Sequence, residues 1–378
     1  MFNQSATLFV RAARKIRYWH IEKDIAAYRS SRTASQGLFS DDRSVLRSDL
    51  RFQLPHSDAI NLHWIAGFID YSDFLSKVPH QTPIVWTLHD MNPFTGGCHY
   101  DQGCGKFAAR CGACPQLGSK EDSDLSRHIW QRKREALAKI PSGRLQIVAD
   151  SNWLASEARR SSLFGKVPIT AIHYGLDIDD FAPRDRLFAR AALGIPADAK
   201  VALFVADSLD ERRKGFATLV NALTDLPRGS EPFLLSVGSG KPVLSGRFSH
   251  LHLGRVSGDR FLSLVYSAAD VFVIPSLQEA FGQTALESIA CGTPVVGFNV
   301  GGIPEVVREG VTGLLASVGD PRALQDAILN MLSNPSLRTK LASNCRKVAV
   351  EEYALAVQAK RYVELYTTLL GHRPEARN

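Results

Sequence analysis

Short apolar runs bounded by turn-forming residues recur along the chain, and they predict buried parallel strands. In the first half of the chain these runs span residues 59–64, 83–89 and 144–150. Segments of helical composition lie between them, such as residues 125–139. Strands that alternate with helices indicate a parallel α/β sheet.

A second series of the same kind begins near Lys200. The stretch between the two series, residues 172–183, is rich in turn formers and is interpreted as an interdomain connection. We therefore expect two Rossmann-like, doubly wound domains that face each other across a cleft, with ligands bound beyond the carboxyl ends of the strands. In the second series, strands are expected over residues 201–206, 233–237, 250–253, 271–275 and 294–297, and helices over residues 215–226, 261–269, 283–291 and 321–332.

These patterns divide the chain into four parts. We expect a helical N-terminal segment over residues 1–57 and an acceptor domain over residues 58–175. A donor domain is expected over residues 176–352, and a C-terminal helix over residues 353–371 that packs back toward the acceptor domain. The length of 378 residues agrees with two or three domains.

Composition narrows the class of protein. Apolar residues make up 45% of the chain and charged residues 22%, as in ordinary soluble proteins. No apolar run approaches about 18 residues, so no transmembrane helix is expected. At the N-terminus the charges follow the short apolar stretch, which is the wrong order for a secretory signal peptide. We therefore expect a cytoplasmic protein.

The net charge of +7 is concentrated near the N-terminus, where a basic helix is expected over residues 7–29. Two interpretations of this helix stay open: a core-packing helix with a solvated basic side, or a helix that lies on an anionic membrane surface. Nucleic-acid binding is not expected, because no basic run with interleaved aromatic residues recurs elsewhere. The helix would place Phe9, Ala13, Ile16 and Trp19 near one face, with Arg11, Arg14, Lys15 and Arg17 around it.

The most informative segment is residues 275–296, in which a buried strand ends at Pro275 and a helix starts near Gln283. The free backbone N–H groups of such a helix start form an anion site that suits a diphosphate. Glu279 lies in the loop and Glu287 about one turn into the helix. Carboxylates accept hydrogen bonds from hydroxyl groups, so Glu279 would hold a hexose and Glu287 a ribose. The alternative is an acid at a helix start and a carboxylate on a solvated helix face.

This segment resembles the donor-site motif of the GT-B glycosyltransferases of family 4, in which two glutamates are separated by seven residues. Residues 268–276, 299–305 and 310–315 and the connection from His173 to Pro183 resemble the same family. The resemblance covers roughly residues 58 to 368 and implies a retaining glycosyltransferase. Such an enzyme moves a hexose from a nucleotide-diphosphate sugar to a glycan or lipid-linked acceptor. We expect a role in exopolysaccharide or other surface polysaccharide synthesis, with peripheral contact at the inner face of the membrane.

The family requires no catalytic metal, so protein cations must neutralise the leaving diphosphate. The family usually has a Gly-Arg pair after the preceding strand, where this chain has Ala206-Asp207-Ser208, and Arg212 or Arg213 is expected to replace that arginine. The resemblance implies catalytic roles for Glu279, His89 and Lys214. It implies donor-binding roles for Glu287, Phe281, Gly282, Gln283, Arg212, Arg213, Arg255 and Val256.

His89 ends a buried strand, as the family's His-Asp pair often does, and the resemblance places it near the sugar and the acceptor. It would donate a hydrogen bond to the leaving or transferred group, whereas the alternative is a structural histidine. His63 occupies a similar setting.

Four cysteines follow in a Gly-rich loop typical of one branch of the family: Cys98, Cys104, Cys111 and Cys114. A structural zinc site, disulfides and free thiols are the alternatives. The C-x2-C end suits a metal, but the first spacing is wider than usual.

Family members usually begin with a strand, a Gly-rich loop, a helix and a second strand, and none of these is found before Asp58. Residues 1–57 resemble the helical insertion that follows them. The expectation is that the chain begins about one βαβ unit late, which would leave the N-terminal sheet and the acceptor side incomplete. The alternative functions are therefore a shortened, non-catalytic member that binds nucleotide sugar, or another GT-B enzyme such as a sugar-nucleotide epimerase. A phosphorylase would need a cofactor lysine site, which is not found.

Overall fold

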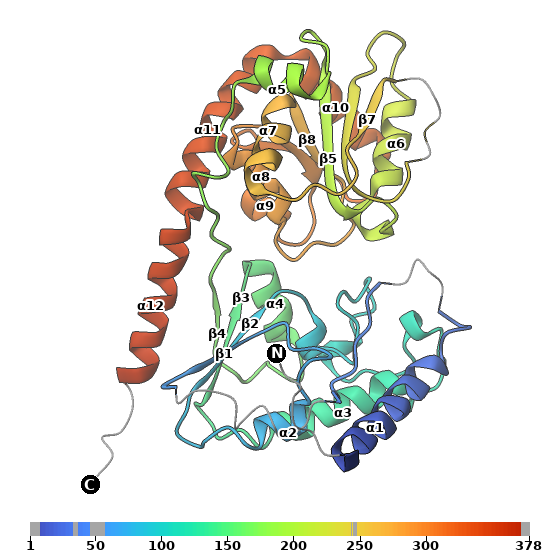
Figure 1. Ribbon diagram of the computed structural model, residues 1–378, viewed down its shortest axis with the longest axis vertical. Coiled ribbons are helices and arrows are strands. Elements are labelled where there is room, and N and C mark those ends of the chain that lie inside the picture. The colour runs from blue at the N-terminus through green and yellow to red at the C-terminus, as the bar shows by residue number, and fades with distance from the viewer. Residues whose placement is uncertain (1–7, 33–36, 46–56, 243, 245–247, 372–378) are drawn as a thin grey trace. The chain divides into compact units, whose positions relative to one another are not determined.

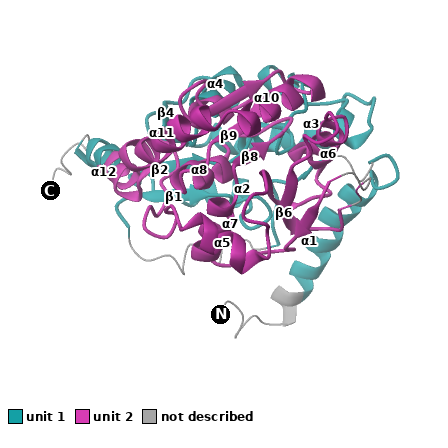
Figure 2. Ribbon diagram, turned by 90° about the horizontal axis from the view of Figure 1, so that it is seen from above, with its two compact units in different colours: residues 1–171, 364–378 teal, residues 172–363 magenta. Residues whose placement is uncertain are grey.

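The computed structural model describes residues 8–32, 37–45, 57–242, 244 and 248–371. The chain forms two compact units, residues 1–171 with 364–378 (unit 1) and residues 172–363 (unit 2), as Figure 2 shows. The division falls at residue 172, slightly before the predicted boundary at residue 176. Each unit contains one parallel sheet (Figure 1). The α/β class predicted from the alternating pattern is confirmed.

Unit 1 has a four-stranded sheet in the order β1-β2-β3-β4, with every neighbouring pair parallel. These strands are Ile60–His63, Ile84–Leu88, Leu145–Ala149 and Ile169–Ala171. Both β2 and β3 are buried along their whole length, which explains their continuous apolar sequence. The described strands follow chain order, so the reversal that defines a doubly wound sheet is not among them.

Helices and 3-10 turns connect these strands. Asp124 begins α3, where its carboxylate accepts a hydrogen bond from the Arg127 N–H, and Ser151 caps α4 in the same way. The connecting elements are α2 (Tyr71–Leu75), η1 (Asn92–Phe94), η2 (Lys106–Ala108), η3 (Pro115–Leu117), α3 (Leu125–Leu137) and α4 (Asn152–Arg160).

The N-terminal helix α1 (Leu8–Ala26) does not pack through its predicted apolar face. Ile16 and Trp19 are more than half exposed, whereas Ile25 packs against the small core around Leu117 and Ile129. The interpretation of α1 as a core-packing helix was therefore wrong about which face of the helix packs against unit 1.

The reason is an ion pair made by Arg17, one of the basic residues expected around the apolar face of the helix. Arg17 pairs with the buried Asp70 and also donates to the Ser44 carbonyl oxygen at 2.6 Å, so its guanidinium turns inward. The predictions for Phe9 and Arg11 concern side chains outside the described part of the chain. In the described residues, no helix combines the length and apolarity that a membrane crossing needs.

Unit 2 has a six-stranded parallel sheet in the order β10-β9-β8-β5-β6-β7, which is the predicted doubly wound topology. Its first strand, β5, pairs with β6 on one side and with β8 on the other, so the strand order reverses between β5 and β8. The strands are β5 (Val201–Ser208), β6 (Phe233–Ser239), β7 (His250–His252), β8 (Val271–Ile274), β9 (Val295–Phe298) and β10 (Gly313–Ala316).

Both faces of this sheet are buried by helices, and each face forms its own core. One core includes Ile289 of α8 and Val348 of α11, and the other includes Leu219 of α6 and Ile328 of α10. The helices are α5 (Arg186–Leu193), α6 (Phe216–Thr224), α7 (Asp259–Ala268), α8 (Gln283–Ala290), α9 (Ile303–Val306) and α10 (Pro321–Ser333), with the 3-10 turn η4 (Arg212–Lys214) after β5.

Two long helices, α11 (Pro335–Tyr353) and α12 (Leu355–Gly371), end the fold. The break between them lies at Ala354, which forms an isolated parallel bridge with Leu176 of the interdomain connection. The last turns of α12 belong to unit 1, where the Asn61 Nδ2 atom donates to the Tyr366 hydroxyl at 2.8 Å.

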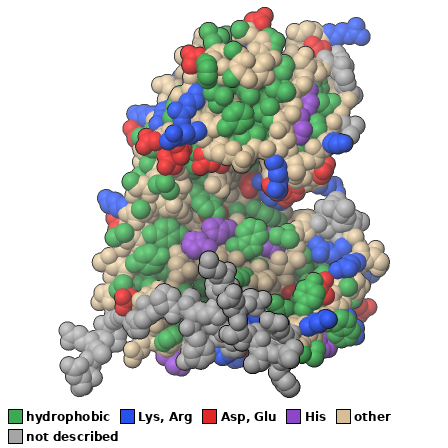
Figure 3. Space-filling view, in the orientation of Figure 1, with side chains coloured by type: hydrophobic (Ala, Val, Ile, Leu, Met, Phe, Trp, Pro, Cys, Tyr) green, Lys and Arg blue, Asp and Glu red, His purple; other side chains and the backbone are tan. Residues whose placement is uncertain are grey.

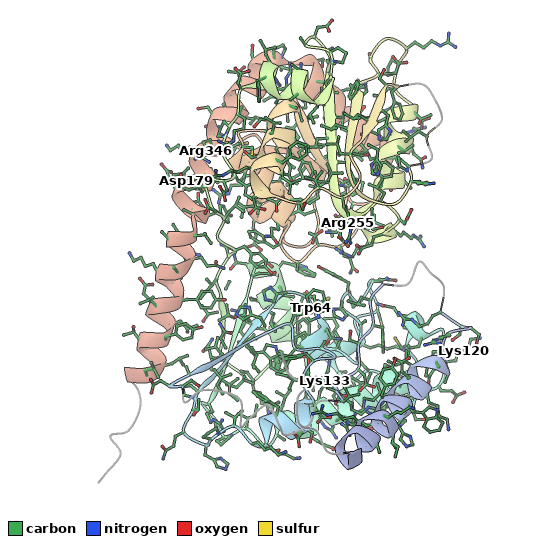
Figure 4. All side chains as sticks on the ribbon, in the orientation of Figure 1. Trp64, Lys120, Lys133, Asp179, Arg255 and Arg346 are labelled. Atoms are coloured by element: carbon green, nitrogen blue, oxygen red, sulfur yellow. The ribbon has the colours of Figure 1, made fainter. Side chains whose placement is uncertain are left out.

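A buried lysine holds the loop that follows β2. Lys133 of α3 is fully buried, and its Nζ donates to the carbonyl oxygens of Asn92 at 2.5 Å and Thr95 at 3.1 Å (Figure 4). Burial lowers the pKa of this amine to about 8. The lysine therefore supplies two hydrogen bonds to a segment that has little regular structure of its own.

We expect Lys133→Met to reduce the free energy of unfolding by about 1–3 kcal/mol, because it removes the lysine donor of the Thr95 carbonyl group and one of the donors of the Asn92 carbonyl group. Chemical denaturation monitored by circular dichroism would measure the loss. Lys120→Met, which removes an exposed lysine of the same unit, is the control. Equal stability of the two variants would show that Lys133 does not hold the loop.

Candidate functional site

The site is centred on the carboxylate of Glu279, in the loop between β8 and α8. Its Oε2 atom lies 2.7 Å from the Lys214 Nζ, 3.2 Å from the Ser276 Oγ and 3.4 Å from the Arg213 Nη1. The side chain is 8% exposed. The structure thus brings together two of the three predicted catalytic residues, Glu279 and Lys214, with one predicted donor-binding arginine.

The cations keep this buried carboxyl group ionised. Burial alone would raise the pKa of Glu279, but Lys214 and Arg213 outweigh burial and hold that pKa below its ordinary value. The group is therefore a carboxylate at neutral pH, and all its strong partners are hydrogen-bond donors.

These residues come from the two loops at the reversal of strand order. Lys214 lies in η4, after β5, whereas Glu279 follows β8. In doubly wound sheets, ligands bind outside the carboxyl ends of the strands at this position. The start of α8 lies in the same loop, with Gly282 in the left-handed region at a φ of 98°. Its backbone N–H groups add a second source of positive potential.

Two close backbone approaches fix the Glu279 loop. A Cβ atom on Gly215 would lie 1.9 Å from the carbonyl oxygen of Pro275, and one on Gly301 would lie 1.9 Å from that of Glu279. Backbone hydrogen bonds seal both contacts, from Leu277 N to Arg213 O at 2.8 Å and from Gly302 N to Glu279 O at 3.0 Å. Sequence reasoning did not assign these glycines a role, although Gly215 follows Lys214 directly.

Glu287 lies on α8, and its Oε2 accepts a hydrogen bond from the Tyr266 hydroxyl at 2.8 Å. Burial raises the pKa of this carboxyl group to about 7. The alternative of a carboxylate on a solvated helix face is not what the structure shows. At neutral pH this group is divided between its acid and its anion, so small changes in its surroundings change its charge.

Some of the other predicted donor-binding residues are exposed to solvent, and others are buried. Gln283 and Arg212 are exposed at the start of α8 and in η4, whereas Val256 is partly buried and packs against the core. The side chain of Phe281 is buried in a cluster of aromatic rings with His173, Tyr174 and Tyr353. The buried ring of Phe281 therefore suits a role in supporting the loop between β8 and α8, and it does not support direct contact with a donor.

An ion pair occupies the position where the family's Gly-Arg pair is absent. The Arg255 Nη2 lies 2.6 Å from the Oδ1 of Asp207, and both side chains are exposed (Figure 4). Arg213, one of the two expected replacements, already contacts Glu211 at 2.8 Å and the Gln278 carbonyl oxygen at 2.8 Å. The structure therefore offers Arg255, which follows β7, as a further cation beside the end of β5, in addition to Arg212 and Arg213.

In unit 1, the third predicted catalytic residue, His89, forms a pair with His63. The Nδ1 of His63 and the Nε2 of His89 lie 2.9 Å apart at the carboxyl ends of β1 and β2. Burial and the neighbouring His63 lower the pKa of His89 to about 4. His89 is therefore neutral at physiological pH, and one of its ring nitrogens donates a hydrogen bond while the other accepts one.

A shallow cavity open to solvent lies beside this histidine pair, and its lining includes Trp64, Thr87, His89, Asp90 and His99. Asp90, the partner of His89 in the His-Asp pair, binds His99, with 2.6 Å between its Oδ2 and the ring Nδ1. In the view of Figure 3, histidine side chains of unit 1 lie between hydrophobic ones. Trp64 and His99 were missed by the sequence reasoning.

The four cysteines line one small cavity, together with Phe39 and Phe107. Burial raises the pKa of Cys98 and raises that of Cys111 to about 11, so these thiols are protonated at neutral pH. All four are free thiols as they stand. Within the described residues, no group of three potential ligands is arranged to hold a metal ion. The side chains as placed do not form a zinc site, and zinc binding by this loop stays a prediction.

Comparisons with known proteins place these observations in a family. Residues 185–348 match the family described as Glycosyl transferases group 1. The chain is 26% identical over 348 residues to D-inositol 3-phosphate glycosyltransferase from Thermobispora bispora, covering 86% of this chain and 74% of the relative. It is 35% identical over 313 residues to D-inositol 3-phosphate glycosyltransferase 2 from Catenulispora acidiphila, covering 77% of this chain and 66% of that protein.

A solved structure with a similar fold is sucrose-phosphate synthase from Thermosynechococcus elongatus. It superposes with a TM-score of 0.59 at 27% identity, over 78% of this chain and 69% of that chain. The predicted GT-B fold is confirmed by these comparisons together with the two parallel sheets.

The ion pair between Lys214 and Glu279 yields a stability prediction. Because Lys214 is partly exposed and Arg213 remains, we expect Lys214→Met to lower the free energy of unfolding at pH 7.5 by about 1–3 kcal/mol. The contribution of Glu279, whose pKa is lowered in the folded state, is present above its unfolded pKa and disappears as the pH falls through the folded pKa. The stability difference should therefore shrink on acidification.

Urea denaturation at pH 7.5 and pH 4 measures this difference. The double variant Glu279→Gln/Lys214→Met should recover part of the loss, and Lys340→Met is the exposed control. A loss of the same size at both pH values would contradict the ion-pair account.

Proposed function

Because the chain belongs to the group 1 glycosyltransferases of the GT-B fold, we propose that it transfers a hexose from a nucleoside diphosphate sugar, with retention of configuration at the anomeric carbon. The acceptor is a glycan or lipid-linked sugar of surface polysaccharide synthesis. The observation that carries the proposal is the contact of Lys214 and Arg213 with the buried Glu279 at the reversal of strand order.

Each group has a role that follows from its charge. Lys214, Arg212 and Arg213 would bind the diphosphate with the backbone amides at the start of α8, and so stabilise the charge that develops as it leaves. Glu279 would accept hydrogen bonds from the hexose hydroxyls. Glu287 would accept hydrogen bonds from the ribose, for which it must be in its anionic form.

In the transfer step, the bond between the anomeric carbon and the diphosphate oxygen breaks, and its electron pair leaves with the diphosphate. An acceptor hydroxyl oxygen bonds to the anomeric carbon on the same face, and its proton passes to the departing phosphate oxygen. His89, which is neutral, would hydrogen bond to a reacting hydroxyl without adding charge. We propose that this chemistry proceeds without a catalytic metal and depends on the protein cations.

The names of the two relatives suggest one acceptor for the assay. They are called D-inositol 3-phosphate glycosyltransferases, so inositol phosphates belong in the acceptor panel beside hexosides. A cytoplasmic location and contact with the membrane face agree with a lipid-linked acceptor, and both stay part of this proposal.

The first functional prediction concerns Glu279 and Lys214. We expect Glu279→Gln and Lys214→Met each to lower kcat/KM for donor turnover by about 100-fold or more, because removal of one preorganised electrostatic group typically costs that much. Transfer and hydrolysis would be measured by nucleotide release with a panel of UDP-, GDP- and ADP-hexoses.

The exposed residues Glu351 and Lys340 supply matched controls, Glu351→Gln and Lys340→Met. Turnover that both site variants retain in full would overturn the proposal. Donor binding without any turnover by the parent protein would support the non-catalytic alternative.

The raised pKa of Glu287 predicts a pH dependence. Because this pKa is about 7, the Glu287 carboxyl group loses its proton between pH 6 and pH 8. The affinity for a nucleoside diphosphate sugar should therefore rise over this range, because only the carboxylate accepts hydrogen bonds from the ribose through both oxygens. The free energy of unfolding of the protein alone changes with pH in the opposite direction. The protonated carboxyl contributes stability below its unfolded pKa, and this contribution is lost as the pH rises through about 7.

Calorimetric titrations at pH 6, 7 and 8 would measure the affinity of the parent protein and of Glu287→Gln. The variant should bind more weakly and lose most of the pH dependence. A parent affinity that does not change over this range would exclude Glu287 from the ribose contact.

A further inference from the structure

Trp64 is a large apolar side chain that the fold leaves uncovered. It follows β1 directly, and its side chain is 57% exposed (Figure 4). The neighbouring residues Ile65 and Ile69 are buried, at 4% and 6% exposure, and two backbone hydrogen bonds to the Ile65 carbonyl oxygen close the turn between them. The loop is therefore anchored while its indole faces outward.

The backbone at Trp64 is held in an unfavourable conformation. Its φ is 29°, in the region that bulky L residues rarely adopt. Such a conformation is energetically unfavourable and is typically found at binding sites and active sites. The next glycine, Gly67, has a φ of 74° and no atom within 4 Å of an added Cβ, so the loop has a site where positive φ is free of strain. The strained positive φ angle nevertheless occurs at Trp64.

The surroundings of Trp64 are those of a binding site. Trp64 lines a shallow cavity open to solvent, and His89 and Thr87 line the same cavity. The ring of His99 lies 5.6 Å from the indole ring, centroid to centroid. His99 is itself fixed between Asp90, at 2.6 Å, and the Ser40 hydroxyl, at 2.8 Å. One wall of the cavity is therefore a rigid aromatic surface, and another carries polar groups from the end of β2.

We propose that Trp64 is the stacking platform for the acceptor, which it recognises through the C–H face of a six-membered polyol ring. The face of an indole carries negative potential, and the C–H bonds on the flat side of such a ring are weakly positive. The hydroxyl groups at the rim of the same ring would reach the hydrogen-bonding nitrogen atoms of the histidine pair. This inference rests on the proposed function and adds to it the residue that positions the acceptor ring.

Two sources supply this chemistry, a pyranose ring of a glycan and a cyclitol ring. Both present ring C–H groups on one side and hydroxyl groups at the edge. The stacking surface selects the ring, and the hydroxyl pattern distinguishes the two sources. A stacked nucleobase is a different proposal, which the test must separate.

The test uses two variants of the full chain. Trp64→Gly removes the indole and places at this position the residue that adopts a positive φ without strain. Trp64→Tyr keeps an aromatic face. Trp19→Ala is the matched control, because Trp19 of α1 is 56% exposed and lies outside the cavity lining.

Binding would be measured by saturation-transfer NMR and tryptophan fluorescence, with alkyl hexosides and inositol phosphates as probes, in the presence of UDP, GDP or ADP. We expect Trp64→Gly to weaken the binding of the preferred ring by about 10- to 100-fold, as for a central aromatic contact of an interface. Trp64→Tyr should restore most of the affinity, and Trp19→Ala should match the parent.

A structural role for Trp64 predicts a different pattern. If Trp64→Gly lowers the thermal unfolding midpoint and weakens all ligands alike, the indole supports the fold and the inference is overturned. A selective loss of nucleotide affinity would also overturn it, in favour of a stacked base. Binding of no probe in the panel by the parent protein would overturn it too. The proposed function has its own readout, the Glu279-dependent hydrolysis of the donor, so the two failures are distinguishable.

Discussion

The structure of unit 2 around the candidate site depends on one buried carboxylate and its cations. An ionised carboxyl group removed from water costs on the order of several kcal/mol unless a positive charge and hydrogen bonds compensate it. Glu279 is compensated by Lys214 and Arg213, which come from a loop 65 residues away in the chain. The pairing therefore requires that β5 and β8 be neighbours in the sheet, and the doubly wound order provides this. The close backbone contacts of Gly215 and Gly301 then hold the loop that carries Glu279 in the position that this ion pair requires.

The same ion pair holds the lysine in place. Glu279 neutralises Lys214, so the cation lies at the end of the sheet where the proposed donor binds. A preorganised group needs little rearrangement when charge develops on the ligand, which is the main source of electrostatic catalysis. The start of α8 adds backbone dipoles at fixed positions. The site is thus arranged for an anion before one arrives.

Much of this arrangement could be predicted from sequence. Strands β2, β3 and β5 are fully or almost fully buried, so each appears as an apolar run, and the predicted ranges agree with the structure within two residues at each end. Strands β4 and β10 were not predicted, because their side chains are only partly buried and their sequences lack such a run.

Residues whose environment depends on distant contacts could not be predicted. The inward face of α1 is determined by Arg17 and its ion pair with Asp70, which no periodicity within the helix encodes. Trp64 ends an apolar run and therefore suggested a core residue, although it is exposed. The contact of Gly301 with the Glu279 carbonyl likewise joins two loops and has no local signature.

The two units differ in where they depart from favourable backbone geometry. Among the described residues, the non-glycine positions with positive φ are Trp64, Gln102 and Ala113, and all three belong to unit 1. At the described positions of unit 2, every positive φ falls on a glycine, including Gly215, Gly282 and Gly301. Sequences that specify a fold are locally consistent, and departures from that consistency are expected where a binding surface imposes its own geometry. The strain of unit 1 therefore lies beside the histidine pair and in the cysteine loop, whereas the loops around Glu279 in unit 2 place their positive φ angles on glycines.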